Sequence, residues 1–157
     1  MPLVLASLKS SLQSQWLVPD GGSFPASASE SGDRFAAAVA GWFSSAMAGG
    51  FPCSTAMARK SQLASAAGAA FATEASAAAG NMLALGVALY IVGQSFGPGF
   101  AGMPIAQSGA GALFGATFAD TNTGISDKAQ QIASGCLVLA VSTIVAFSIP
   151  PFAAPVS

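Results

Sequence analysis

Few side chains in this sequence of 157 residues could carry out covalent or acid–base chemistry. Cys53 and Cys136 could supply a thiolate, but they lie far apart in the chain and have no metal-ligand spacing. Histidine, the commonest general base and the usual partner of a nucleophilic cysteine, is absent. We therefore expect two free cysteines that serve as small core residues in a reducing compartment.

The six carboxylates are the remaining candidates for acid–base chemistry, and their positions do not suggest a common site. Five of them lie in predicted loops or at predicted helix starts, where an acid opposes the helix dipole. These five are Asp20, Glu30, Asp33, Asp120 and Asp127. Glu74 stands alone among small residues, and we expect it to point to solvent; the alternative is an ion pair with Arg59 or Lys60 of a neighbouring subunit.

The glycine-rich stretches do not form a phosphate-binding loop. Gly97-Pro98-Gly99 and the later spaced glycines lack the Lys-Ser/Thr ending of such a loop, and no clear strand precedes them. We therefore predict no catalytic residue, no cofactor and no metal site, and we expect that the protein is not an enzyme.

The composition points to a surface that is covered by something other than water. Apolar residues make up 53% of the chain and charged residues 7%, against roughly 25% charged residues in ordinary soluble domains. With a net charge of −1 and a single adjacent pair of cations, the chain has no basic patch for nucleic acid. Lipid or other protein chains must cover much of the surface.

The N-terminal segment predicts an amphipathic helix over residues 2–17. Leu5, Leu8, Leu12 and Trp16 recur three or four positions apart and form one apolar stripe. Residues 18–33 are rich in Pro, Gly, Ser and Asp and read as a loop, after which Ser31 or Asp33 could cap the next helix.

Two helical repeats are predicted to follow, over residues 34–92 and 104–141, with a turn region over 93–104. In the first repeat a helix ends at paired glycines, and Ser54 or Thr55 offers the next N-cap. The alanine-rich helix after it has a predicted break near Gly80 and Asn81. In the second repeat Thr123 or Ser126 could cap the helix that begins near residue 127.

A final segment, residues 142–157, alternates β-branched or aromatic residues with smaller ones and then meets Pro150 and Pro151. This alternation favours an extended strand, although a continuing helix remains an alternative. Such a strand could add to the sheet edge of a neighbour.

An internal similarity suggests how the helices are organised. A shift of 68 residues aligns Lys60 with Lys128, and one further residue aligns QLAS at 62–65 with QIAS at 131–134. Each motif follows a polar loop that contains glycine, so we predict duplicated helical hairpins. The expected fold is a single mainly α domain over residues 1–157 with an extended or β-like C-terminal segment.

Membrane insertion is the main competitor of protein assembly as an explanation of the low charge. Residues 132–149 approach the length of a membrane span but contain several Ser, Thr and Gly residues and end in prolines. A small integral membrane protein of holin or pore-forming type is therefore the alternative, and membrane association is the less expected outcome. Obligate protein interfaces are apolar enough to explain the whole composition.

The stretches FAAAVAGWFSSAMAGGFP and KAQQIASG, with the ending STIVAFSIPPFAAP, resemble small Ala/Gly-rich virion proteins of tailed bacteriophages. The resemblance implies a structural subunit of the neck or tail, located in the virion and assembled in the host cytoplasm. It also implies contacts with identical copies and with other virion proteins, and it transfers no functional residue. We predict that the interfaces use the N-terminal stripe and the C-terminal segment: Leu5, Leu8, Leu12, Trp16, Ile144, Phe147, Ile149 and Phe152.

Overall fold

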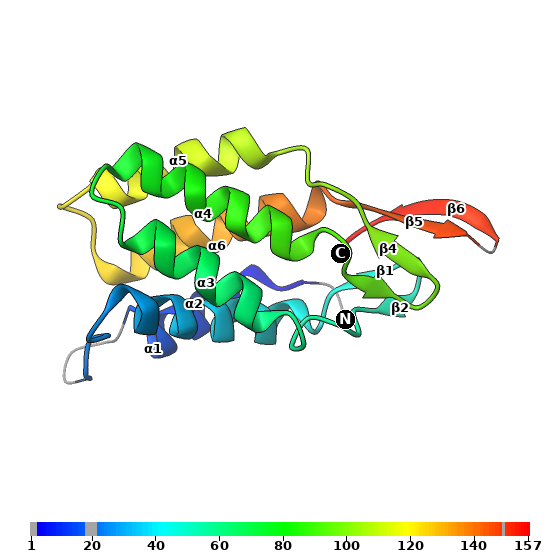
Figure 1. Cartoon of the computed structure of the whole chain (residues 1–157), viewed down its shortest axis with the longest axis horizontal. Coiled ribbons are helices and arrows are strands. Elements are labelled where there is room, and N and C mark those ends of the chain that lie inside the picture. Colours follow the sequence, from blue (N-terminus) through cyan, green and yellow to red (C-terminus); the bar gives the residue numbers. More distant parts are fainter. Residues whose placement is uncertain (1–2, 18–21, 149) are drawn as a thin grey trace.

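The computed structural model describes residues 3–17, 22–148 and 150–157. It is mainly α, as the sequence predicts, with short β-hairpins gathered at one end of the helices (Figure 1). The helices are α1 (Leu5–Gln15), α2 (Ala28–Phe43), α3 (Lys60–Phe71), α4 (Ser76–Ile91), α5 (Gln107–Ala119) and α6 (Ile125–Val141).

The helices alternate in direction along the molecule. We call the end that carries the hairpins the β end and the opposite end the loop end (Figure 1). α2, α4 and α6 run towards the β end, whereas α1, α3 and α5 run towards the loop end. Consecutive helices pack against each other, and α1 also packs against α6, so the helices enclose one apolar core.

The hairpins form a closed ring of short strands at the β end. β1 (Met47–Ala48) pairs with β2 (Phe51–Pro52), and a second sheet has the order β3 (Ser95–Phe96), β4 (Gly99–Ala101), β5 (Ile144–Ser148), β6 (Pro151–Pro155). A bridge between Cys53 and Phe96 joins the two sheets on one side. On the other side Met47 and Ser157 exchange two backbone hydrogen bonds of 2.9 Å.

Two parts of the chain share one arrangement of helix, hairpin and helix. α2 and α4 are each 16 residues long, and the hairpins that follow them turn at Gly49 and Gly97, which both have φ of 56°. Glycine adopts this left-handed conformation without the steric cost that a side chain brings. α6 is likewise followed by a hairpin, β5 and β6, and α1 packs against α6.

The predicted duplication at a 68-residue shift is not confirmed by these elements. α3, which contains QLAS, begins at the β end directly after a hairpin, whereas α6, which contains QIAS, begins at the loop end. The two helices therefore run in opposite directions and occupy different places in their units. The sequence similarity lies in helix composition and not in equivalent positions.

The start of α2 differs from the prediction. This helix begins inside the segment that reads as a loop over residues 18–33, and Ser27 rather than Ser31 or Asp33 is its N-cap. The Ser27 hydroxyl accepts a hydrogen bond of 3.1 Å from the Glu30 backbone N–H, and the Glu30 carboxylate accepts one from the Ala26 N–H. This pair of bonds resembles a capping box, except that Glu30 reaches the residue before the N-cap, and it outweighs the low helix propensity of the serines.

Two other helix starts lack the side-chain caps that the sequence suggests. α3 begins at Lys60 and not after Ser54 or Thr55, because the chain first pairs with β3 through the Ser54 N–H and the Ser95 carbonyl (3.0 Å). α6 begins at Ile125, with Gly124 in the N-cap position in place of Thr123 or Ser126.

The break in the alanine-rich segment lies at residues 72–75 and not near Gly80 and Asn81, which are inside α4. Gly80 allows close helix packing, because a Cβ there would lie 2.2 Å from the Gly115 backbone nitrogen.

The extended C-terminal segment is confirmed as β5 and β6. Among the residues described, no helix has the length and hydropathy of a membrane span.

Candidate functional site

The apolar stripe of α1 faces the core of its own chain. Leu8, Leu12 and Trp16 are buried, and Leu5 is half-buried against the same core. The prediction that this stripe docks on a neighbour is therefore wrong for the three buried residues. The cause is the position of α1 between α2 and α6, where its stripe completes the helical core.

The C-terminal residues of the predicted interface divide into two groups. Ile144 is 50% exposed and Phe152 40% exposed. Phe147 is buried, and its ring stacks on that of Phe152 with 4.3 Å between centroids. Ile149 lies outside the described residues. Of the described residues in this group, Ile144 and Phe152 are thus placed where a neighbouring chain could reach them.

Further exposed apolar side chains lie on the elements that flank Ile144, and the sequence does not predict them as an interface. The β4–α5 connection lies beside the start of β5, because the Gly102 N–H donates to the Ile144 carbonyl (2.9 Å) and the Ala106 N–H to the Ser142 hydroxyl (3.3 Å). Ile105 in this connection is 87% exposed and Phe100 before it 60% exposed. We call the following residues the β-end patch: Phe100, Met103, Ile105, Val138, Val141 and Ile144.

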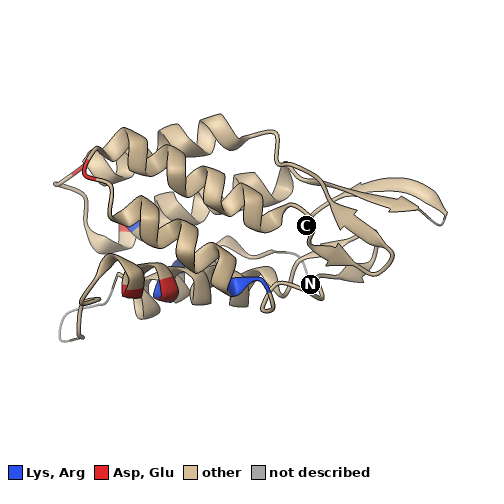
Figure 2. Ribbon diagram, viewed as in Figure 1, with Lys and Arg blue, Asp and Glu red and all other residues tan. Residues whose placement is uncertain are grey.

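The charged side chains lie mostly away from this patch. Figure 2 shows most of them near the loop end, with one basic site where α3 begins. Arg59 at that site donates to the carbonyls of Val92 and Leu89 at the end of α4, where cations oppose the helix dipole. The sequence already indicates an uncharged surface, because residues 75–119 and 129–157 contain no charged side chain.

The free edge of β6 is unsuited to pairing with another sheet. The Val156 N–H donates to the Thr143 carbonyl (3.1 Å), so residues 151, 153 and 155 must direct their backbone away from β5. Two of these positions are Pro151 and Pro155, which have no N–H to donate. The expected strand addition to a neighbour is therefore blocked along most of this edge.

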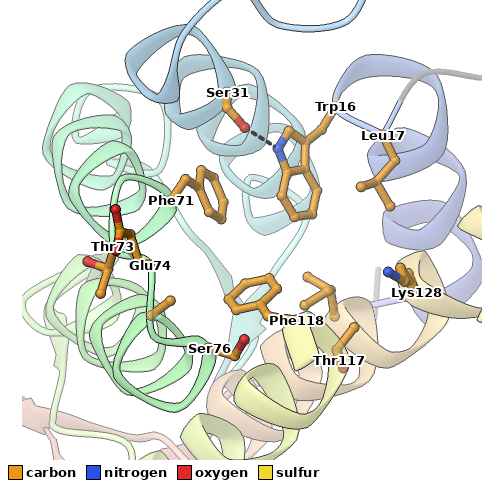
Figure 3. Close-up of a pocket in the computed structure, with 13 residues that line it drawn as sticks. Trp16, Leu17, Ser31, Phe71, Thr73, Glu74, Ser76, Thr117, Phe118 and Lys128 are labelled. Carbon is orange, nitrogen blue, oxygen red and sulfur yellow. Dashed lines mark hydrogen bonds between the residues drawn. The ribbon is translucent and has the colours of Figure 1, made fainter. Parts of the chain in front are cut away.

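The loop end contains a pocket of about 380 Å³ with aromatic walls. α1, α3 and α5 all end here, and each places one aromatic residue in the pocket: Trp16, Phe71 and Phe118. Ring centroids of Trp16 and Phe71 lie 4.9 Å apart, and those of Phe71 and Phe118 lie 6.1 Å apart. The Trp16 indole N–H donates to the Ser31 hydroxyl (2.6 Å; Figure 3).

Two charged side chains also line this pocket, on opposite sides. Figure 3 shows Lys128 on the side of Leu17, whereas Glu74 lies beside Thr73. Among the residues described, neither Lys128 nor Glu74 forms a hydrogen bond or salt bridge. The sequence does not predict that Glu74 and Lys128 share a pocket, because they lie far apart in the chain.

Both cysteines are free and buried, as expected. Desolvation by the surrounding protein raises the pKa of the Cys53 thiol and raises that of Cys136 to about 12. Both groups therefore remain thiols at neutral pH and make poor nucleophiles. Within the described ranges, no group of three or more Cys, Asp and Glu side chains could hold a metal ion.

We expect both thiols to resist alkylation by iodoacetamide in the folded protein at pH 8. Unfolding in guanidinium should make both react at the rate of a free cysteine, because it removes the burial that raises each pKa. Mass spectrometry of quenched time points measures the two rates. Rapid labelling of Cys53 in the folded chain would contradict the buried position of this residue.

No protein family, curated protein or solved structure matches this chain. The candidate sites are therefore defined by geometry alone: an uncharged apolar surface at the β end and an aromatic pocket at the loop end.

Proposed function

We propose that this protein is a structural subunit of a tailed-phage virion, in the neck or tail, and that it acts by packing against copies of itself and against other virion proteins. The observation that carries the proposal is the β-end patch. Six apolar side chains of this patch are exposed, no charged residue is among them, and the adjoining hairpins are also uncharged. Exposure of such a surface to water is unfavourable, whereas obligate protein interfaces have this composition.

A second exposed apolar surface supports the same proposal. Met82, Leu85 and Leu89 recur three and four positions apart on the outer face of α4, and each is more than 40% exposed. Core-facing positions of α4 are filled by other residues, such as Leu83 and Val87, so the exposed stripe is not needed for folding. Two separate apolar surfaces would allow one subunit to contact two neighbours, as ring assembly requires.

We also propose that the chain consists of repeated helical hairpins, in a register different from the one that the sequence similarity suggested. This idea is supported by the equal lengths of α2 and α4 and by the two turn glycines with the same φ. It is further supported by Gly32 and Gly80, which occupy corresponding sites of close helix contact. Repetition within the subunit would suit a protein that packs beside copies of itself.

The substitution Ile105→Lys tests assembly through the β-end patch. We expect the wild-type protein to be oligomeric in dilute buffer and the variant to be smaller, because a patch contact would bury the added charge without a partner. Sedimentation velocity measures both masses, and circular dichroism checks that the helices remain. Ile105 is 87% exposed, so the variant should fold normally.

Phe24→Lys is the matched control, because Phe24 is also an exposed apolar residue (72%) but lies outside the patch, before α2 at the loop end. Its mass should equal that of the wild type. A monomeric wild-type protein would overturn the assembly proposal, and unchanged assembly of Ile105→Lys would overturn the role of the patch. Electron microscopy of purified phage particles labelled with antibody to this protein tests the virion location; unlabelled particles would exclude it.

A further inference from the structure

We infer that the loop-end pocket binds a small monocarboxylate that has an apolar body. This inference is independent of the proposed assembly function, because the pocket lies where α1, α3 and α5 end and the β-end patch lies at the opposite end of the helices (Figure 1).

The cavity has the size and lining of a small-molecule site. Its volume of about 380 Å³ falls within the range of roughly 300–1,000 Å³ that is usual for ligand pockets. The rings of Phe71 and Phe118 are only half-buried, and Leu17 is likewise half-buried at the same cavity. An apolar ligand body would remove this remaining apolar surface from water.

The rigidity of the aromatic wall also suits ligand binding. The Trp16 ring is held from three sides: by stacking on Phe71, by an edge contact with Phe35 at 5.2 Å, and by the hydrogen bond to Ser31. The wall is therefore preformed, and binding of a ligand would cost little conformational entropy of the protein side chains.

Lys128 selects the charge of the ligand. Its side chain is half-buried and lacks a hydrogen bond or salt bridge among the residues described, whereas Glu74 across the pocket is exposed to water. Water screens an exposed charge more effectively than a half-buried one. Asp120 on the α5–α6 loop interacts electrostatically with Lys128 without forming a salt bridge, and its carboxylate accepts hydrogen bonds from the N–H groups of Asn122 and Thr123 and from the Thr123 hydroxyl.

A ligand carboxylate at Lys128 would form a close ion pair with it, which none of the described Asp or Glu side chains does. The same ligand body with a hydroxyl head would gain the apolar contacts but not this pair. An amine head would be repelled by Lys128 and attracted only by the exposed Glu74. The three head groups thus give different affinities if the assignment is correct.

Octanoate, octanol and octylamine are the probes, because they share one apolar chain and differ in the head group. The protein has two tryptophans, and their indole N–H signals in nitrogen-15 NMR spectra report on different ends of the molecule. Trp16 lines the pocket, whereas the Trp42 indole N–H donates to the Val4 carbonyl (3.1 Å) near the β end. A Trp42→Phe variant assigns the two signals.

We expect octanoate to shift the Trp16 signal at about tenfold lower concentration than octanol, the usual effect of one charge-assisted contact. The Trp42 signal should not move. Lys128→Met should reduce the octanoate affinity to that of octanol, whereas Lys60→Met, which removes a cation at the opposite end, should leave it unchanged.

Three results would overturn the assignment: tighter binding of octylamine than of octanoate, equal movement of both indole signals, or unchanged octanoate affinity in Lys128→Met. Equal affinities of octanoate and octanol for the wild-type protein would also overturn it. This last comparison needs no substitution, so it decides the question even if a variant fails to fold.

Discussion

Replacement of Gly80 by alanine should destabilise the protein by at least about 2 kcal/mol, although alanine is the better helix former. A Cβ at this position would lie 2.2 Å from the Gly115 nitrogen, 2.5 Å from the Gly115 Cα and 2.7 Å from the Gly111 carbonyl oxygen. All three are backbone atoms, so no side-chain rotation can relieve the clash. α4 and α5 must separate, and the apolar contacts between them are lost along their length.

Gly109→Ala is the matched control, because it makes the same change in α5 at a site where a Cβ meets nothing within 4 Å. We expect this variant to gain up to about 1 kcal/mol, the usual advantage of alanine over glycine in a helix. Thermal or guanidinium unfolding of both variants measures the difference. If Gly80→Ala were as stable as Gly109→Ala, the close crossing of α4 and α5 would be incorrect.

Helix positions could be predicted from the sequence because apolar periodicity and turn residues extend over many positions. The stripe Leu5, Leu8, Leu12 predicts α1, whereas Gly49-Gly50 marks the turn of the hairpin that follows α2, and the helix itself already ends at Phe43. The two-residue strands β1, β2 and β3 are too short to show an alternating pattern, so their hairpins read only as turns. β5 is longer, and the alternation of its larger and smaller side chains predicts a strand.

The roles of individual residues were harder to predict, because they depend on which elements meet. An apolar stripe such as that of α1 fits either a neighbouring chain or the core of its own chain, and the sequence favours neither. A glycine inside a helix, such as Gly80, has the same composition signal whether it breaks the helix or packs against another one. Long-range packing distinguishes these cases, and local patterns contain no information about it.

The aromatic pocket shows the same limit. Trp16, Phe71 and Phe118 lie at the ends of three different helices, and each one alone resembles an ordinary core residue. They meet because α1, α3 and α5 run in the same direction and end at the same level. Prediction of the pocket would have required the direction of each helix, and the similarity between residues 62–65 and 131–134 suggests one direction for α3 and α6, which run in opposite directions.

Replacement of Gln94 by leucine should cost about 2–4 kcal/mol, the second large effect that we expect. Gln94 is completely buried where α4 meets the strand ring. Its side-chain oxygen accepts a hydrogen bond from the Thr55 hydroxyl (2.5 Å), and its side-chain nitrogen donates to the Tyr90 carbonyl (3.0 Å). Leucine has a similar size but leaves the Thr55 hydroxyl and the Tyr90 carbonyl without these partners.

Gln15→Leu is the control for this change, because Gln15 is exposed at the end of α1, and its substitution should alter the free energy of unfolding by no more than about 0.5 kcal/mol. The double variant Thr55→Val with Gln94→Leu should be more stable than the sum of the two single losses predicts. In each single variant one buried partner of the bond remains unpaired, whereas the double variant removes both partners. Strict additivity in urea unfolding would show that this bond does not link the first hairpin to α4.

Gln94→Glu separates the hydrogen bonds that this side chain accepts, from the Thr55 hydroxyl and the Cys53 thiol, from the one that it donates to the Tyr90 carbonyl. The carboxylate could still accept from Thr55, but only its protonated form could donate to the Tyr90 carbonyl. Burial should raise the pKa of this Glu in the folded state above its value of about 4.3 in the unfolded chain. The stability of the variant is therefore greatest below that value and falls as the pH rises through the folded-state pKa. Gln94→Leu should show no such pH dependence relative to the wild type, and equal pH profiles of the two variants would place residue 94 in contact with water.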